Sequence, residues 1–186
     1  SRDSMWEHSR LPWVPPSPNM PHLSTLYHYP GASLVEGTNC SEGRGTTLPF
    51  EIVGAPWIDA HTLADRLNNE AWAAPMGARF RPHSFRPTSS KWSGEDCHGV
   101  QVYITDLIRW RPIEVWIGTI AMIRSMYPDQ FEWNKHHFDR LIGSSWVRSE
   151  IESCDGNAIH ALLARFGTEW REDCNAFALE LSLIHI

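Results

Sequence analysis

The segment 29–47 of this chain reads YPGASLVEGTNCSEGRGTT. It places two carboxylates, Glu36 and Glu42, and the guanidinium of Arg44 among closely spaced glycines and small polar residues. Glycine lets the backbone approach a ligand closely, and charged side chains among glycines have little apolar surface to pack and need a polar partner. This composition is typical of a polar ligand site.

The part of this segment from Glu36 to Thr47 closely resembles the E-G-T-N-x-S-E-G-R-G-T-T signature of the NamZ-type exo-β-N-acetylmuramidases. These are bacterial enzymes that trim N-acetylmuramic acid from peptidoglycan fragments. Further matches follow the order of the family: Leu11–Pro21, Pro49–Asp59, Phe80–Pro82, Gly99–Val102, Tyr127–Pro128 and Phe138–Ser144. The resemblance therefore runs almost from end to end.

The resemblance also implies a domain organisation. Members of the family carry a larger Rossmann-like domain ahead of the segment that begins at Leu11, so we expect a truncated fragment holding the C-terminal portion of the family pattern. Residues 1–55 would be the end of the Rossmann-like catalytic domain, carrying the Glu/Gly/Arg loop, and residues 56–186 a C-terminal α+β domain. Leu181–Ile186 depart from the basic, tyrosine-rich ending of the family, and we interpret them as foreign read-through. The localisation is unknown from the chain itself; the family suggests a secreted or periplasmic bacterial protein.

Composition excludes several classes of protein. The net charge of −6, with no run of Lys or Arg, argues against binding to nucleic acid. No apolar run approaches the roughly twenty residues that span a bilayer, so we expect no membrane span. The four cysteines, Cys40, Cys97, Cys154 and Cys174, lack zinc-ligand spacing and are expected to be free thiols, with one disulfide left open if the protein is exported. The adjacent His136–His137 pair would point in different directions, so we expect no metal site there. The resemblance to the family implies hydrolysis without a cofactor.

The hydrophobic pattern predicts an α+β fold with a small antiparallel sheet and several helices. Asp59 is a candidate N-cap for an amphipathic helix that follows it, and the apolar stretch from Ile113 to Met126 indicates a buried helix. The proline-rich segment 11–21 is expected to be extended, with Ser17–Asn19 either linker or turn. We expect strands at 24–29 with 32–36, 78–85 and 100–104, and helices at 60–70, 113–126, 145–153 and 157–178.

Glycoside hydrolysis usually takes two carboxyl groups, and Glu36 and Glu42 are the candidates for catalysis. In an extended chain six residues would separate them by about 20 Å, beyond the ~5–9.5 Å that the chemistry uses, although turns at Gly37 and Gly43 could shorten that distance. We therefore expect one catalytic carboxylate here and the other in the Rossmann-like part. Glu36, predicted at a strand end, is the favoured acid/base; its alternative is an acceptor for backbone amides. The alternative to a catalytic role for Glu42 is an ion pair with Arg44 that holds the loop.

N-acetylmuramic acid differs from N-acetylglucosamine by a lactyl ether that carries a carboxylate. A guanidinium binds a carboxylate through paired hydrogen bonds, so Arg44 is the candidate that reads this group. Thr38, Asn39, Ser41 and Thr46 are candidates for bonding sugar hydroxyls or the acetamido group, although each has an equally good local use in a turn. Trp57 either stacks on a sugar face or packs in the core.

Two functions compete. The first is a fragment of an exo-β-N-acetylmuramidase acting on a peptidoglycan-derived sugar, which we expect to be inactive alone. The second is a non-catalytic module that binds cell-wall sugar or a partner protein, built mainly from residues after Trp57. A phosphate-binding loop is a weak third reading because segment 37–43 lacks the Gly-Lys-Ser/Thr ending.

Overall fold

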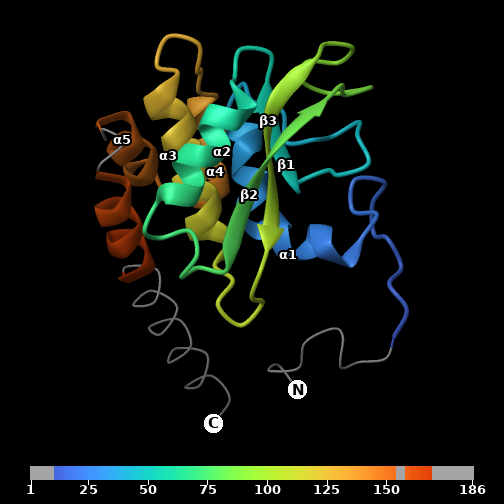
Figure 1. The fold of residues 1–186 in the computed structure, drawn as a ribbon, viewed down its shortest axis with the longest axis horizontal. Coiled ribbons are helices and arrows are strands. Elements are labelled where there is room, and N and C mark those ends of the chain that lie inside the picture. Colours follow the sequence, from blue (N-terminus) through green and yellow to red (C-terminus); the bar gives the residue numbers. More distant parts are fainter. Residues whose placement is uncertain (1–10, 154–157, 169–186) are drawn as a thin grey trace.

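The computed structural model describes residues 11–153 and 158–168, which form an α+β fold (Figure 1). This confirms the predicted fold class. A three-stranded antiparallel sheet has the order β1-β3-β2, formed by β1 (Ile52–Ala55), β2 (Ala78–Phe85) and β3 (Cys97–Ile104). The helices are α1 (Leu23–Ala32), the 3₁₀ helix η2 (Ser33–Gly37), α2 (Ala60–Asn69), α3 (Pro112–Met126), α4 (Lys135–Ile142) and α5 (Trp146–Ser153), and residues 159–168 are also helical. Helices α3, α4 and α5 gather on one side of the sheet, to the left in Figure 1.

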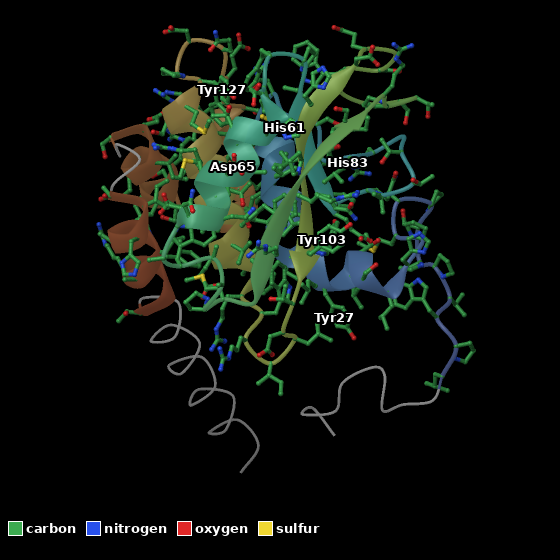
Figure 2. The ribbon with its side chains drawn as sticks, viewed as in Figure 1. Tyr27, His61, Asp65, His83, Tyr103 and Tyr127 are labelled. Atoms are coloured by element: carbon green, nitrogen blue, oxygen red, sulfur yellow. The ribbon has the colours of Figure 1, made fainter. Side chains whose placement is uncertain are left out.

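The helices α2 and α3 form where the sequence predicts them. Asp59 caps α2, its Oδ1 accepting a hydrogen bond from the backbone N–H of Thr62 at 2.6 Å. The backbone N–H of Asp59 in turn donates to the Tyr127 hydroxyl at 2.9 Å, and Figure 2 shows Tyr127 near this end of α2. Helix α3 has Pro112 in its first turn and is buried without interruption over residues 115–123, as its apolar pattern indicates.

The strands predicted at 78–85 and 100–104 are confirmed as β2 and β3, and β3 begins three residues earlier. Phe80 pairs with Val102, and both side chains enter the core. Helix α2 packs against both strands.

The outer edge of β2 is bonded to the chain that surrounds it. Asn68, near the end of α2, donates from Nδ2 to the Phe80 carbonyl at 2.7 Å and accepts at Oδ1 from the Phe80 N–H at 3.0 Å. The Ala78 N–H donates to the Ala73 carbonyl at 3.0 Å. Further along the strand, Pro82 has no N–H to offer.

The strand predicted across 24–36 is wrong, because this segment forms α1 and η2. Thr25, His28 and Ala32 are buried, and their spacing matches one face of a helix that packs on α3. Pro30 lies in the last turn of α1 and does not prevent this packing. The Ser17–Asn19 tip is a turn, in which the Asn19 N–H donates to Ser17 Oγ at 3.2 Å.

Two elements were not predicted. Strand β1 is short, and α4 is only about two turns long, although its apolar residues Phe138, Leu141 and Ile142 have helical spacing. Asn134 caps α4 by accepting from the His137 N–H at 3.3 Å, and Gly143 ends it with a φ of 79°.

Residues on both sides of the predicted boundary at residue 55 share one core. Strand β1 is hydrogen-bonded to β3, α1 packs on α3, and Leu34 and Val53 belong to the same buried cluster as Ile117. We therefore propose that the folded unit in this chain begins ahead of α1. The helix predicted at 157–178 is described only in part, and residues 169–186, with the expected foreign tail, lie outside the described residues.

Candidate functional site

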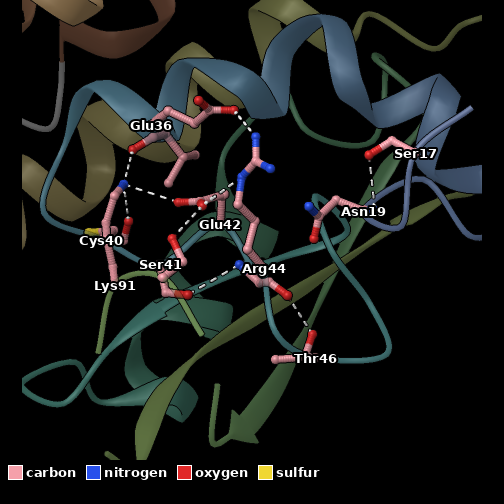
Figure 3. A network of polar contacts seen from close by, with 12 residues as sticks. Ser17, Asn19, Glu36, Cys40, Ser41, Glu42, Arg44, Thr46 and Lys91 are labelled. Carbon is pink, nitrogen blue, oxygen red and sulfur yellow. Dashed lines mark hydrogen bonds and ion pairs between the residues drawn. The ribbon is translucent and has the colours of Figure 1, made fainter. Parts of the chain in front are cut away.

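The two candidate carboxylates meet on one guanidinium. Arg44 Nη2 lies 2.9 Å from Glu36 Oε1, and Arg44 Nε lies 3.2 Å from Glu42 Oε1 (Figure 3). The segment is not extended, so the separation of about 20 Å does not apply: η2 and the turn at Gly43, with a φ of 80°, fold the segment back on itself, which is the shortening that the glycine turns allowed. The sequence therefore builds a compact cluster around Arg44.

The two carboxylates differ in access to solvent. The side chain of Glu42 is 2% exposed, whereas those of Glu36 and Arg44 are 23% and 30% exposed. Glu36 lies in the last turn of η2 and not at a strand end, so that part of the prediction is wrong. Of the two carboxylates, Glu36 is the one that a ligand can reach.

Lys91 holds the buried carboxylate and the loop around it. Its Nζ lies 3.0 Å from Glu42 Oε2 and donates to the carbonyls of Val35 and Cys40 at 2.9 and 2.8 Å. Although this oxygen lacks a partner with hydrogen-bond geometry, the contact with the ammonium is close enough to compensate its charge. Lys91 therefore ties the two sides of the loop together.

The backbone that presents Lys91 is strained. Ser90 and Trp92 on either side of it have φ values of 70° and 58°, which non-glycine residues rarely adopt. Trp92 Nε1 donates to the Asn39 carbonyl at 2.6 Å, and Thr88 donates from its backbone N–H to the Gly45 carbonyl at 2.9 Å. These two hydrogen bonds hold the strained backbone in place, so that segment 88–92 closes over the motif.

His137 approaches the accessible carboxylate from α4. Its Nε2 lies 3.7 Å from Glu36 Oε2, and Arg140 Nη2 lies 2.9 Å from its Nδ1. Because a guanidinium only donates, Nδ1 is the acceptor and Nε2 carries the proton. The approach depends on Gly37, where a Cβ would lie 2.6 Å from the Cβ of Phe138.

Most of the candidate sugar-binding groups have partners inside the protein. Thr38 and Ser41 are buried; Thr38 donates to the Val35 carbonyl at 2.8 Å, and Ser41 Oγ accepts from the Gly43 N–H at 3.2 Å. Thr46 donates to the Gly43 carbonyl at 2.7 Å. These contacts are the local turn uses that the sequence also allows, so contact with sugar remains a prediction.

Two further candidates also make contacts within the fold. Asn39 binds segment 130–132 through its side chain, donating to the Gln130 carbonyl at 2.8 Å and accepting from the Glu132 N–H at 3.0 Å. Trp57 packs against the core, and the centroid of its ring lies 5.4 Å from that of Tyr127. Of its two predicted uses, the structure therefore shows packing.

The described cysteines are buried free thiols. Burial raises the pKa of Cys40 to about 12 and that of Cys97 to about 11, which makes both poor nucleophiles. Cys154 and Cys174 lie outside the described residues. Within residues 11–153 and 158–168, no group of three or more His, Cys, Asp or Glu side chains is arranged to hold a metal ion, and no helix is long and apolar enough to cross a membrane.

Lys91, His137 and Arg140 were missed by sequence reasoning. Each lies far along the chain from the motif, and the only local signal was the polar turn Ser89–Gly94 with a tryptophan inside it. Contacts between distant segments bring these side chains to Glu36 and Glu42, and neither periodicity nor spacing reports such contacts.

Comparison with known proteins places the chain. The family described as "Exo-beta-N-acetylmuramidase NamZ, C-terminal" matches residues 27–182. The peptidoglycan beta-N-acetylmuramidase NamZ of Bacillus subtilis (strain 168) is 44% identical over 149 residues, which cover 80% of this chain and 35% of that protein. The chain thus spans about a third of the length of this relative.

Two crystal structures have a similar fold. Both are DUF1343 family proteins from Bacteroides fragilis NCTC 9343. One has a TM-score of 0.74 at 27% identity, covering 88% of this chain and 47% of the other. The second has a TM-score of 0.55 at 28% identity, covering 89% and 41%. With the family match extending over most of its length, this chain belongs to the NamZ exo-β-N-acetylmuramidase C-terminal family.

Proposed function

We propose that this chain is the C-terminal portion of an exo-β-N-acetylmuramidase that releases terminal N-acetylmuramic acid from cell-wall glycan. The observation that carries the proposal is the position of Arg44, which presents a partly exposed guanidinium beside the partly exposed carboxylate of Glu36. An anionic sugar that also needs an acid at its glycosidic oxygen requires this pair of groups.

In this proposal Glu36 acts as the acid/base. Its carboxylate is held by Arg44 on one side and faced by His137 on the other, so its direction is fixed by groups on two separate elements. Glu42 is buried between Arg44 and Lys91 and orients Arg44 without reaching the sugar. The second catalytic carboxylate is supplied by the part of the family that precedes this segment.

The role of Arg44 is to recognise the lactyl carboxylate. Its guanidinium also lies over the Phe50 ring, 4.9 Å from the centroid, which fixes its plane. A fixed planar donor favours two-point contact with a carboxylate. Asn39 and Thr46, which are partly exposed at the rim of the same loop, are the proposed contacts for neutral parts of the sugar.

Substitution of Glu36 in a longer parent that includes the upstream part tests the assignment. Glu36→Gln should keep sugar binding and lower turnover of a muramic acid glycoside by at least the ~100-fold typical of acid–base catalysis. Glu95→Gln, at an exposed carboxylate, is the matched control and should leave turnover unchanged. Wild-type turnover in Glu36→Gln, or a larger loss in Glu42→Gln, would remove the assignment.

A non-catalytic module that binds cell-wall sugar or a protein is the second candidate. It is favoured by the short coverage of the curated relative and by the buried core that the described residues of this chain form. The 186-residue chain alone should show no turnover, and the longer parent should show it. Turnover by neither protein, with sugar binding by this chain, would favour the binding module.

A further inference from the structure

The four charges at the centre of the site sum to zero. Arg44 and Lys91 contribute two positive charges, and Glu36 and Glu42 contribute two negative charges. Within these four side chains neither cation is in excess, because Arg44 Nε, Arg44 Nη2 and the Lys91 ammonium already have carboxylate partners. Arg140 lies outside the cluster and binds His137 Nδ1. A sugar carboxylate that binds Arg44 therefore adds an uncompensated negative charge to a partly buried cluster, which is costly.

One carboxylate must then leave Arg44 or gain a proton. Glu42 is the poorer candidate because it is buried, contacts Lys91 as well as Arg44, and has Ser90 Oγ at 3.4 Å. Glu36 makes one ion pair with Arg44, through Nη2, at the accessible end of the cluster. An incoming carboxylate that takes Nη2 replaces Glu36 there.

The groups that face Glu36 determine where the proton goes. They are Arg44 from the loop and His137 from α4, with Arg140 behind His137. Protonating His137 would break the hydrogen bond that its Nδ1 accepts from Arg140 and would place two cations side by side. Glu36 is the remaining group that can accept the proton.

We propose that a substrate carboxylate displaces Glu36 from Arg44 and that Glu36 then takes up one proton from solvent. This inference rests on the proposed function and deepens it. One O–H bond forms on Glu36, Arg44 keeps its charge, and the site returns to neutrality. The ionised Glu36 of the free protein becomes the neutral acid that glycoside cleavage requires.

The consequence concerns selectivity. N-acetylglucosamine has no lactyl carboxylate, so it leaves Glu36 paired with Arg44 and ionised. The discrimination between the two sugars then arises in the protonation state of the acid as well as in affinity.

Calorimetry with the 186-residue chain tests the exchange. N-acetylmuramic acid is titrated near pH 7 in two buffers with different ionisation enthalpies, and N-acetylglucosamine is the comparison ligand. Linkage predicts uptake of about one proton for each muramic acid bound and none for glucosamine. Glu36→Gln should bind muramic acid at least as tightly, because Arg44 Nη2 is freed, and should lose the uptake, while Glu95→Gln should retain it.

Several results would overturn the exchange. These are the absence of muramic acid binding, binding without proton uptake, uptake that persists in Glu36→Gln, and uptake lost in His137→Gln but kept in Glu36→Gln. Hydrolysis of muramic acid glycosides by the longer parent is measured separately. Hydrolysis without proton uptake on binding leaves the proposed function standing and removes the exchange, whereas uptake without hydrolysis by the parent removes the proposed enzyme.

Discussion

Lys91 Nζ and Glu42 Oε2 lie 3.0 Å apart, joining a turn between β2 and β3 to the centre of the glycine-rich loop. The same ammonium donates to the carbonyls of Val35 and Cys40, so its three donors face three acceptors from one loop. The other lysine of the chain, Lys135, pairs with Glu152 on the surface. Lys91 therefore stabilises the conformation of the loop and also compensates the buried charge of Glu42.

Lys91→Met should destabilise the protein by about 2–4 kcal/mol, because it leaves the buried Glu42 carboxylate short of a cation and removes the hydrogen bond from Lys91 to the Cys40 carbonyl, whereas the Val35 carbonyl keeps Thr38 as a donor. Lys135→Met is the control, since Lys135 pairs with Glu152 at 3.1 Å while 62% exposed, and such a pair contributes roughly 0–1 kcal/mol. Urea denaturation measures both. Equal losses would show that the contacts of Lys91 are no stronger than a surface pair.

Gly37→Ala should destabilise the fold and displace α4. The new Cβ would lie 2.6 Å from Phe138 Cβ and 2.7 Å from Phe138 Cα, and backbone must move to relieve that contact, at a cost of about 1–3 kcal/mol or more. Gly94→Ala is the comparison, because its Cβ meets nothing within 4 Å and only its φ of 82° carries a cost, about 1 kcal/mol. Thermal unfolding that ranks Gly94→Ala as the more harmful change would contradict the close approach.

Stability should fall as the pH is lowered from about 6.5 to 4. Burial lowers the pKa of His28 to about 4, so between these values the unfolded chain binds a proton that the folded chain does not. The folded state therefore loses up to about 3 kcal/mol across this window relative to neutral pH. Denaturation at several pH values, with His28→Leu as the variant that lacks the group, checks the slope. An unchanged slope in the variant would assign the effect to other groups.

Arg44→Lys should weaken binding of N-acetylmuramic acid more than binding of N-acetylglucosamine. An ammonium is a point charge and cannot stay paired with Glu42 while offering a ligand carboxylate two parallel hydrogen bonds. Titration of both sugars measures the difference. Equal losses for the two sugars would indicate that Arg44 only holds the loop.

Backbone hydrogen exchange tests the proposed domain boundary. The amides of α1 should be protected to a degree similar to those of α3, because the two helices pack together and share one core. Fast exchange across α1 with slow exchange across α3 would instead favour the boundary at residue 55. The comparison uses two helices of the same molecule, so solution conditions are matched.

Features that depend on local sequence signals were predicted, and features that depend on contacts between distant segments were not. Helix α2 was predicted because its signals are local: Asp59 is an N-cap residue, and the apolar residues that follow it have helical spacing. Helix α1 was not, because Pro30 and Gly31 look like a break and only packing on α3 shows that the helix continues through them. Tertiary contact overrides a weak local preference.

The candidate site divides in the same way. Glu36, Glu42 and Arg44 were predicted from composition, because charged residues among glycines need partners. Their mutual pairing was open, since Arg44 was expected to face the ligand and to pair with Glu42 only as an alternative. Lys91 and His137 reach the cluster from a distant turn and from α4, and no sequence pattern specifies that approach.

The contacts of Asn68 with Phe80 limit how other chains can attach to this protein. An unprotected edge strand is a template on which a further strand can add, in aggregation or in recognition of an extended peptide. Along β2, Ala73 and Asn68 already bind the outward N–H groups of Ala78 and Phe80, and Pro82 has none. Over residues 78–82 the outward N–H groups of β2 are therefore not available to a further strand, which disfavours strand addition along this part of the edge.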